Sequence, residues 1–236
     1  MLKQPEIQIC DCCFFECPII TEICIPSSVT SIGKYAFYYC SSLKKITFKA
    51  PSSLFSIESN AFECCYGLKE ITIPSSVISL GGYSFNNCSL KQIFFEKPSS
   101  LQLIGSSAFS GCRSLEQISF PPSLVSIERE AFKECRSLKQ ILFEEPSSLN
   151  IIGKNSFYEC KSLMEVSIPT SVTKIEDSAF TLCESLKKLV ILSPETFVEK
   201  GVFKGCPSIS EVSIPSTLNP SEIGIGVEYH IIKIGM

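Results

Sequence analysis

The sequence predicts a β-rich α/β solenoid, a superhelix of about nine repeats of 23–25 residues with short strands and single helical turns. Three observations predict this class: a recurring Phe with Cys three residues later, a nearly constant interval between these motifs, and one short alternating apolar segment per interval. A fixed period of this length is typical of repeat architectures. We expect one solenoid domain over 1–236, with a partial repeat at 1–13 and a capping strand at 224–236.

All repeats share one register. The motif pairs are Phe14/Cys17, Phe37/Cys40, Phe62/Cys65, Phe85/Cys88, Phe109/Cys112, Phe132/Cys135, Phe157/Cys160, Phe180/Cys183 and Phe203/Cys206. The steps between the phenylalanines are 23, 25, 23, 24, 23, 25, 23 and 23 residues, and the step of 24 reflects one residue deleted after Cys88.

The first element of each repeat is a short strand. Leu or Ile lies three residues after the Cys, and apolar residues follow three and five positions further on, as in Leu43, Ile46 and Phe48. This alternation, rich in β-branched residues, predicts a strand with one buried face. Proline ends the strand because it has no N–H to donate, either directly or after the inserted pairs "KA", "EK" and "EE".

The second element is the return leg that leads to the next Phe. We interpret it as extended chain followed by one helical turn, because it is too short for a full helix. A single 23-residue unit loses roughly 35 kcal/mol of conformational entropy, whereas burial of its apolar side chains returns only about 10–20 kcal/mol. One repeat cannot fold alone, so stability depends on stacking against neighbours.

The repeat pattern also resembles a known family. The consensus "AFxxCxSLxxIxIPSSVxxIGxxAF", present here as "SFYECKSLMEVSIPTSVTKIEDSAF", resembles the BspA-like leucine-rich repeats of bacterial and protozoan surface proteins, over about Ile9 to Ile223. The resemblance implies a right-handed solenoid that binds other macromolecules, adhesion to host-cell or matrix proteins, and a cell-surface location. The opening "MLKQPEIQIC" shows no secretory signal, which argues against that location.

The chain contains 14 cysteines, nine of them in the repeat position. Neighbouring strands lie about 4.8 Å apart, so bridges along this column are sterically feasible. A column of nine cannot pair completely, however, and we expect reduced thiols that pack as small hydrophobes, which favours a cytoplasmic location. The N-terminal "CDCCFFEC" invites a zinc interpretation, but Cys17 belongs to the column and Cys13 replaces a small Ala, so we expect no metal.

Composition argues against several function classes. The net charge of -3 offers no basic field for nucleic acid, and the apolar runs are far shorter than the ~18 residues of a membrane span. His230 is the single histidine and no nucleophile motif accompanies it, while Glu144 and Glu145 lie in a turn. "LGGY" and "GIGVE" lack the spacing of a phosphate-binding loop. We expect no enzymatic activity and no cofactor.

We expect a protein partner to bind the side chains that point outward from the concave sheet, read as columns of equivalent positions in successive repeats. Three apolar residues, Phe94, Leu142 and Val190, alternate with small polar residues and form a candidate contact patch. The alternative is that they only cover neighbouring side chains, as such residues do on any β surface. A second column is mostly basic, with Lys44, Lys69, Lys91, Lys139 and Lys187. A carbohydrate ligand ranks lower because the chain has no Trp.

The two ends suggest a second hypothesis, self-assembly. The strand around Ile23 and Ile25 would form an open edge, and Tyr229, Ile232 and Ile234 keep the Leu, Ile, Ile spacing of a tenth strand. An uncapped edge strand is a template for pairing, which predicts a homodimer formed through one end. The primary hypothesis is a non-catalytic scaffold that binds an unidentified protein partner; the alternative is a structural protein that dimerises.

Overall fold

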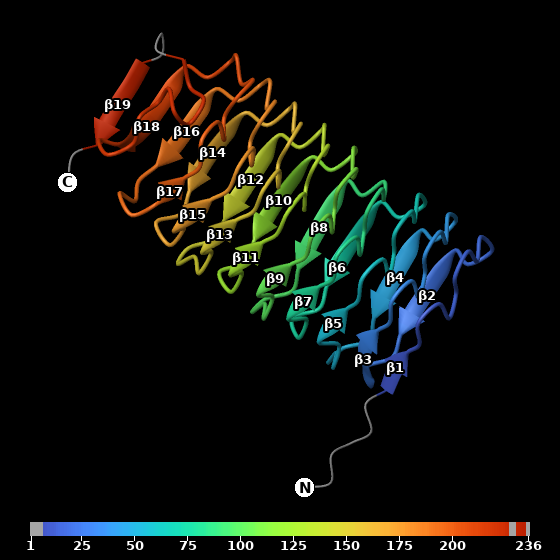
Figure 1. Cartoon of the computed structure of the whole chain (residues 1–236). Coiled ribbons are helices and arrows are strands. Elements are labelled where there is room, and N and C mark those ends of the chain that lie inside the picture. Colours follow the sequence, from blue (N-terminus) through green and yellow to red (C-terminus); the bar gives the residue numbers. More distant parts are fainter. Residues whose placement is uncertain (1–6, 227–229, 235–236) are drawn as a thin grey trace, which may run out of the picture.

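The computed structural model describes residues 7–226 and 230–234. The chain winds into an elongated parallel β-solenoid, with strands β1 and β19 at opposite ends of the stack (Figure 1). We call each turn of the solenoid a rung. Most rungs contribute one longer strand to one face and one short strand to another, because each repeat contains two extended segments separated by turns.

The longer strands form what we call the long-strand face. They are β2 (Glu22–Ile25), β4 (Lys45–Phe48), β6 (Glu70–Ile73), β8 (Gln92–Phe95), β10 (Gln117–Phe120), β12 (Gln140–Phe143), β14 (Glu165–Ile168), β16 (Lys188–Ile191), β18 (Glu211–Pro215) and β19 (His230–Ile234). Alternate side chains point inward, as in β6, where Ile71 and Ile73 are buried and Glu70 and Thr72 are exposed. The predicted strands are confirmed.

The return legs form a second, nine-stranded parallel sheet. Its strands are β1 (Ile7–Ile9), β3 (Val29–Ile32), β5 (Ser56–Ile57), β7 (Ser79–Leu80), β9 (Leu103–Ile104), β11 (Ser126–Ile127), β13 (Ile151–Ile152), β15 (Lys174–Ile175) and β17 (Phe197–Val198). The extended part of the predicted return leg is therefore confirmed.

The predicted helical turn is wrong, and so is the α/β label. The described residues contain no helix, and hence none that could span a membrane. The segment before each Cys is instead a series of turns with two left-handed residues per rung, such as Tyr35 and Tyr39. The N–H groups of Tyr35, Phe37 and Tyr39 donate to carbonyls of the next rung at 2.8–3.2 Å, so a helical ladder within the rung cannot form.

The core is a stack of identical side chains. The rings of Phe14 to Phe203 lie one above another with centroids 4.9–5.5 Å apart and nearly parallel planes. Eight of these nine rings, Phe37 to Phe203, are fully buried. Each such contact contributes about 0.5–1.5 kcal/mol beyond area burial, so the column links every rung to its neighbours.

The cysteine column is made of thiols, as predicted. Cys40 to Cys206 of the column are buried and unpaired, and Cys17 is half-buried. Each buried thiol donates to the backbone carbonyl of the Phe one rung earlier, for example Cys135 Sγ to Phe109 O at 3.2 Å. The Phe carbonyl thus gains a partner inside the core, which explains why Cys recurs three residues after Phe.

The two ends differ from the expectation in detail. Cys10 and Cys13 form a disulfide that the sequence analysis does not predict. The tenth strand is confirmed as β19, but its register is shifted by one: Ile231 pairs with Val212 and Ile232 with Ser213. Because Ser213 belongs to an outward column, Ile232 is exposed rather than buried. The expected equivalence of Ile232 with the inward Val212 is therefore wrong.

The long turns interrupt the long-strand face. Three turns carry the inserted pairs, after β4, β8 and β12, and each contains a cis X–Pro bond. The ladders β2–β4 and β6–β8 end at these strands, and β12 pairs with β14 only through Gln140 and Glu165. From β2 to β12 the face is thus divided into pairs of rungs, in agreement with the approximately two-repeat period of the sequence, whereas β14, β16, β18 and β19 form one continuous ladder.

Candidate functional site

The long-strand face carries a hollow between two of the predicted contact residues. Phe94 on β8 and Leu142 on β12 are 47% and 48% exposed, respectively. Between them lies Ser119 of β10, which pairs directly with Leu142 in the ladder. A hollow of about 150 Å³ is lined by Phe94, Ser119 and Leu142 together with flanking strand residues. The alternation of large and small side chains therefore produces a recess rather than a flat apolar surface.

A larger notch adjoins this hollow. It has a volume of about 640 Å³. Its apolar walls include Phe94, Phe95, Pro98, Pro121 and Pro122, and Lys97, Glu144 and three serines also line it. Its shape follows from the turn lengths, because the long turns after β8 and β12 project on either side of the short turn after β10. Apolar walls between two projecting turns are typical of sites that hold an apolar side chain.

An ion pair lies at the border of the notch. Lys97 Nζ is 2.8 Å from Glu144 Oε2, and Ser119 Oγ donates to Glu144 Oε1 at 3.0 Å. The hydrogen bond from the Lys97 ammonium, with help from Ser119, holds the pKa of Glu144 below its usual value against the opposing effect of burial. These three residues come from three successive rungs and join the two long turns.

Val190 does not line this site. It lies on β16 between Ser167 and Ser213, is only partly exposed, and has no part in the hollow or the notch. The structure therefore brings two of the three predicted apolar residues to one recess and places the third two rungs away.

The lysine column lines a separate, shallow groove of about 860 Å³. Lys69, Lys91, Lys139 and Lys187 line it, whereas Lys44 lies outside. Glutamates enter the same groove from the strands and the segments before them; they are Glu70, Glu116, Glu165 and Glu211. Lys139 pairs with Glu116 at 3.1 Å. The groove is consequently mixed in charge.

Only some of the residues predicted to mediate self-association are exposed. Ile25 is buried and Ile23 is half-buried, so β2 offers mainly its backbone edge. At the other end Ile232 is 60% exposed on β19. Tyr229 and the side chain of Ile234 lie outside the described residues.

The described part of the chain contains no cluster of three or more His, Cys, Asp or Glu side chains that could hold a metal ion. His230 belongs to β19 through its backbone, and its side chain is outside the description. Glu144 and Glu145 do not form an acid pair, because Glu144 contacts Lys97 and Ser119 while Glu145 accepts from the Ser147 N–H at 2.9 Å.

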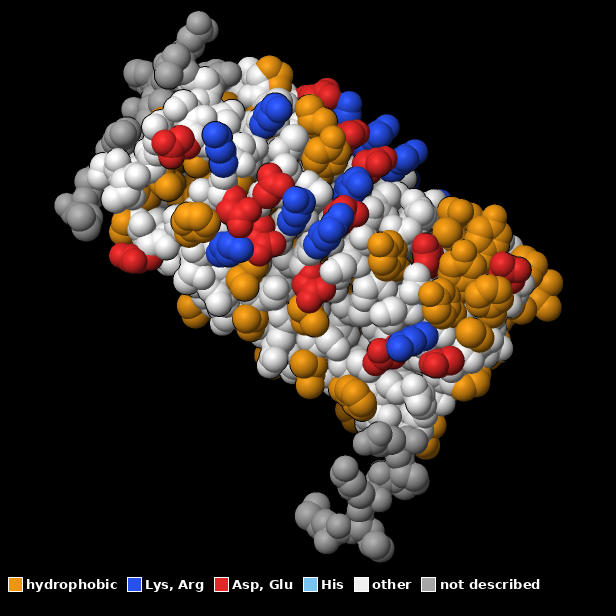
Figure 2. All heavy atoms as spheres, viewed as in Figure 1, with side chains coloured by type: hydrophobic (Ala, Val, Ile, Leu, Met, Phe, Trp, Pro, Cys, Tyr) orange, Lys and Arg blue, Asp and Glu red, His pale blue; other side chains and the backbone are white. Residues whose placement is uncertain are grey.

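One surface feature was missed by the sequence analysis. Five rings gather on the turn side of the N-terminal rungs, and we call them the aromatic patch: Phe15, Tyr35, Tyr38, Tyr39 and Tyr66. Hydrophobic side chains cover this end of the molecule, with acidic side chains among them (Figure 2). The available signal was compositional, since five of the seven tyrosines lie between residues 35 and 83.

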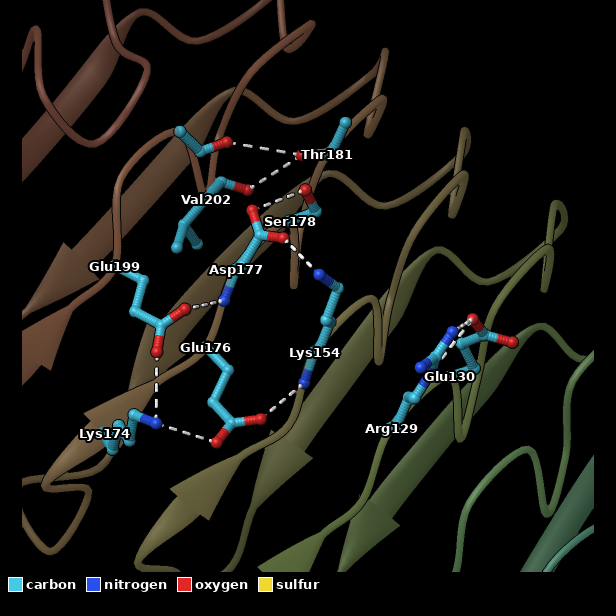
Figure 3. A network of polar contacts seen from close by, with 11 residues as sticks. Arg129, Glu130, Lys154, Lys174, Glu176, Asp177, Ser178, Thr181, Glu199 and Val202 are labelled. Carbon is cyan, nitrogen blue, oxygen red and sulfur yellow. Dashed lines mark hydrogen bonds and ion pairs between the residues drawn. The ribbon is translucent and has the colours of Figure 1, made fainter.

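On the turn side of the C-terminal rungs, charged side chains take the place of the aromatic rings. Lys174 contacts Glu176 at 2.9 Å and Glu199 at 3.1 Å, and Lys154 contacts Asp177 at 2.8 Å (Figure 3). Glu176 and Glu199 also accept backbone N–H groups of the preceding rung. The hydrogen bond from Lys174 lowers the pKa of Glu176, and that from Lys154 lowers the pKa of Asp177. This network fastens neighbouring rungs along their turn side.

Comparisons with known proteins agree with this architecture. The structure is similar to the pneumococcal vaccine antigen PcpA, with 22% identity and a TM-score of 0.52 over 97% of this chain and 71% of that one. It is equally similar to a leucine-rich repeat protein from Eubacterium ventriosum, with 22% identity and a TM-score of 0.52 over 97% and 70% of the two chains. These likenesses show the fold. A search of curated proteins gave no match.

A family model matches directly in sequence. The "BspA type Leucine rich repeat region" matches residues 2–116 and 102–224, with six copies of the repeat. These ranges cover almost all of the rungs described above, including both the long and the short turns. The chain therefore belongs to the BspA-type leucine-rich repeat family.

Proposed function

We propose that the protein is a non-catalytic scaffold that binds a protein partner on its long-strand face. The observation that carries the proposal is the recess formed by the hollow over Ser119 and the adjoining notch, with Phe94 and Leu142 half-exposed at its border. A pocket with apolar walls and a few polar groups is the usual form of a binding site. Membership of a leucine-rich repeat family supports an interaction role.

The recess fits one apolar anchor of a protein partner. Hot spots in protein interfaces are large side chains seated in well-packed pockets, surrounded by contacts that exclude water. The groove of lysines and glutamates on the same face would then supply the polar rim of the interface. Adhesion to a host-cell or matrix protein is the specific form of this function that the family resemblance implies.

Selection from a displayed random peptide library, followed by affinity measurement on variants, tests this proposal. We expect the selected peptides to bind the double variant Phe94→Ser/Leu142→Ser at least tenfold more weakly than the wild type. Val125→Ser is the matched control, because Val125 is 41% exposed but does not line the recess. Failure to select any peptide, or equal affinity for the wild type and the double variant, would contradict the proposal.

A second candidate function is self-assembly through the ends. Exposed Ile232 on the terminal strand β19 and the backbone edge of β2 favour it, because edge strands pair readily. Light scattering across a concentration series measures this directly. A monomer at high micromolar concentration, with no change for Ile232→Lys, would exclude dimerisation through β19.

A further inference from the structure

The aromatic patch occupies positions that hold ion pairs in later rungs. The residue before the column Cys is Tyr39 in one rung and Glu134 in another, and the residue after it is Tyr66 or Arg113. In the later rungs these positions pair as Arg113–Glu134 at 2.8 Å. In the early rungs Tyr39 and Tyr66 meet edge to face at 5.6 Å. Both arrangements connect rungs, but only the aromatic one leaves ring surface exposed.

The rings form a continuous surface rather than isolated contacts. Phe15 stacks on Tyr38 at 4.9 Å, and Tyr38 lies against Tyr35 at 5.8 Å and Tyr39 at 6.1 Å. Phe15, Tyr35, Tyr39 and Tyr66 are each between 38% and 44% exposed. Tyrosine and phenylalanine are enriched in interfaces because they combine large area with little loss of conformational freedom on binding.

Carboxylates border the patch on both sides. The Glu16 N–H donates to the Tyr38 carbonyl at 2.7 Å, and the Tyr39 N–H donates to the Glu63 carbonyl at 2.8 Å, so an acidic residue flanks the rings on each adjoining rung. Burial raises the pKa of Tyr38, and the charges of Glu63 and Glu16 add to this effect. Ion pairs among the described residues lie between Lys97 and Glu199, so these two glutamates have none. The Glu63 carboxylate does accept a hydrogen bond from the Asn60 side-chain amide, which is neutral and leaves its charge in place.

Half-exposed ring faces beside carboxylates that form no ion pair attract cations that can also stack. Guanidinium groups do both, because they are planar, always charged, and bind aromatic faces and carboxylates. From this charge complementarity we infer that the aromatic patch is a second interaction surface, one that binds an arginine-bearing segment of a protein partner. The surface is separate from the recess at Phe94 and Leu142, so this inference goes beyond the proposed function.

The test uses a fluorescein-labelled octapeptide of alternating Gly and Arg, titrated against the full chain by fluorescence polarisation. We expect saturable binding that weakens when Lys replaces Arg and disappears when Glu replaces Arg. The double variant Tyr39→Asn/Tyr66→Asn should lose about fivefold or more in affinity. Glu16→Gln/Glu63→Gln should lose affinity as well, with a smaller dependence on salt than the wild type shows.

Tyr83→Asn provides the matched control. Tyr83 has the same left-handed backbone as Tyr39 (φ 57° in both) and the same 44% exposure, but it makes no aromatic contact within the described residues. Asn tolerates this conformation, so neither substitution strains the turn. We expect Tyr83→Asn and the recess variant Phe94→Ser/Leu142→Ser to bind the arginine peptide as the wild type does.

Three results would overturn the inference. Wild-type affinity in both Tyr83→Asn and Tyr39→Asn/Tyr66→Asn would show attraction to the whole acidic chain rather than to the patch. Equal binding of the Glu peptide would exclude recognition of a cation. Binding of a linear maltooligosaccharide without binding of the arginine peptide would assign the patch to a sugar.

Discussion

Two serines occupy a column that holds alanine in most rungs. Ser84 and Ser156 precede the column Phe, where other rungs have Ala36, Ala61, Ala108, Ala131 and Ala179. Both serine side chains are fully buried, and their hydroxyls have no hydrogen-bond partner. A buried hydroxyl without a partner costs about 1–3 kcal/mol, whereas alanine fits the same space without a polar group.

We therefore expect Ser84→Ala and Ser156→Ala each to raise the free energy of unfolding by about 1 kcal/mol. Urea denaturation monitored by circular dichroism measures the change. The reverse substitution Ala108→Ser is the control and should lower stability by a similar amount. A loss of stability in Ser84→Ala would mean that the Ser84 hydroxyl forms a hydrogen bond in solution, and would contradict this expectation.

The buried thiols of the cysteine column should make the folded state less stable at alkaline pH. Burial raises the pKa of Cys112 and Cys135 well above the usual value, and that of Cys40 to about 11. An unfolded thiol ionises near pH 8.5. Since the folded pKa is raised, the stabilisation is fully present below about pH 8.5 and declines as pH rises toward the folded pKa.

The expected result is a loss of about 1.4 kcal/mol per pH unit for each fully buried thiol above about pH 8.5. Urea midpoints measured from neutral pH to about pH 10 give the slope. Cys135→Ala removes one buried thiol and should reduce that slope by the contribution of a single thiol. A flat profile would show that these cysteines are oxidised or ionised in the folded state.

At the level of the element, the turn before each Cys differs most from expectation. Its left-handed residues recur twice per rung, and most are not glycine; Tyr35, Glu134 and Leu182 are examples. Left-handed backbone costs about 1–2 kcal/mol for a residue with a side chain, and inter-rung hydrogen bonds compensate for it here. No local signal marks such residues, so the sequence could not distinguish these turns from a helical turn.

A substitution at Gly201 measures the free-energy cost of the left-handed backbone in this turn separately from any steric clash of the side chain. Its φ is +74°, and a Cβ added there would meet nothing within 4 Å. We expect Gly201→Ala to lower the free energy of unfolding by about 1 kcal/mol, purely through the backbone. Gly201→Asn should cost less, because Asn tolerates this conformation and occupies the same column at Asn60 and Asn155. Equal stability of wild type and Gly201→Ala would contradict this account.

The strands could be predicted because their cause is local and repeated. Apolar alternation and the following proline mark β4 or β14 within a few residues, and one register fits every rung. The terminal strand β19 was predicted in the wrong register, because "EYHIIKIG" has adjacent isoleucines and either one satisfies the alternation. Only pairing with β18 decides between them.

The candidate site was predictable in part. Phe94 and Leu142 follow from reading one column across the rungs. The notch beside them depends on the three-dimensional projection of two long turns, joined by Lys97 and Glu144 across a short one. The aromatic patch depends on contacts between turns of successive rungs, which no single repeat displays.

Across the whole molecule, one repeated frame carries three different surfaces. Aromatic rings lie on the turn side of the N-terminal rungs, and the recess lies in the middle of the long-strand face. Ion pairs connect the C-terminal rungs (Figure 3). The stacked Phe and Cys columns hold the backbone constant through all of them. Outward positions are therefore free to vary, as expected of an interaction scaffold.

If a partner binds in the recess itself, a variant in which the recess is filled must bind that partner more weakly. Ser119→Trp would place a large ring between Phe94 and Leu142 while adding exposed apolar surface. Affinity for the selected peptides, measured by fluorescence polarisation, should fall at least tenfold if an anchor must enter the hollow. Unchanged or higher affinity would show that the face only attracts apolar groups in general, and would contradict the account.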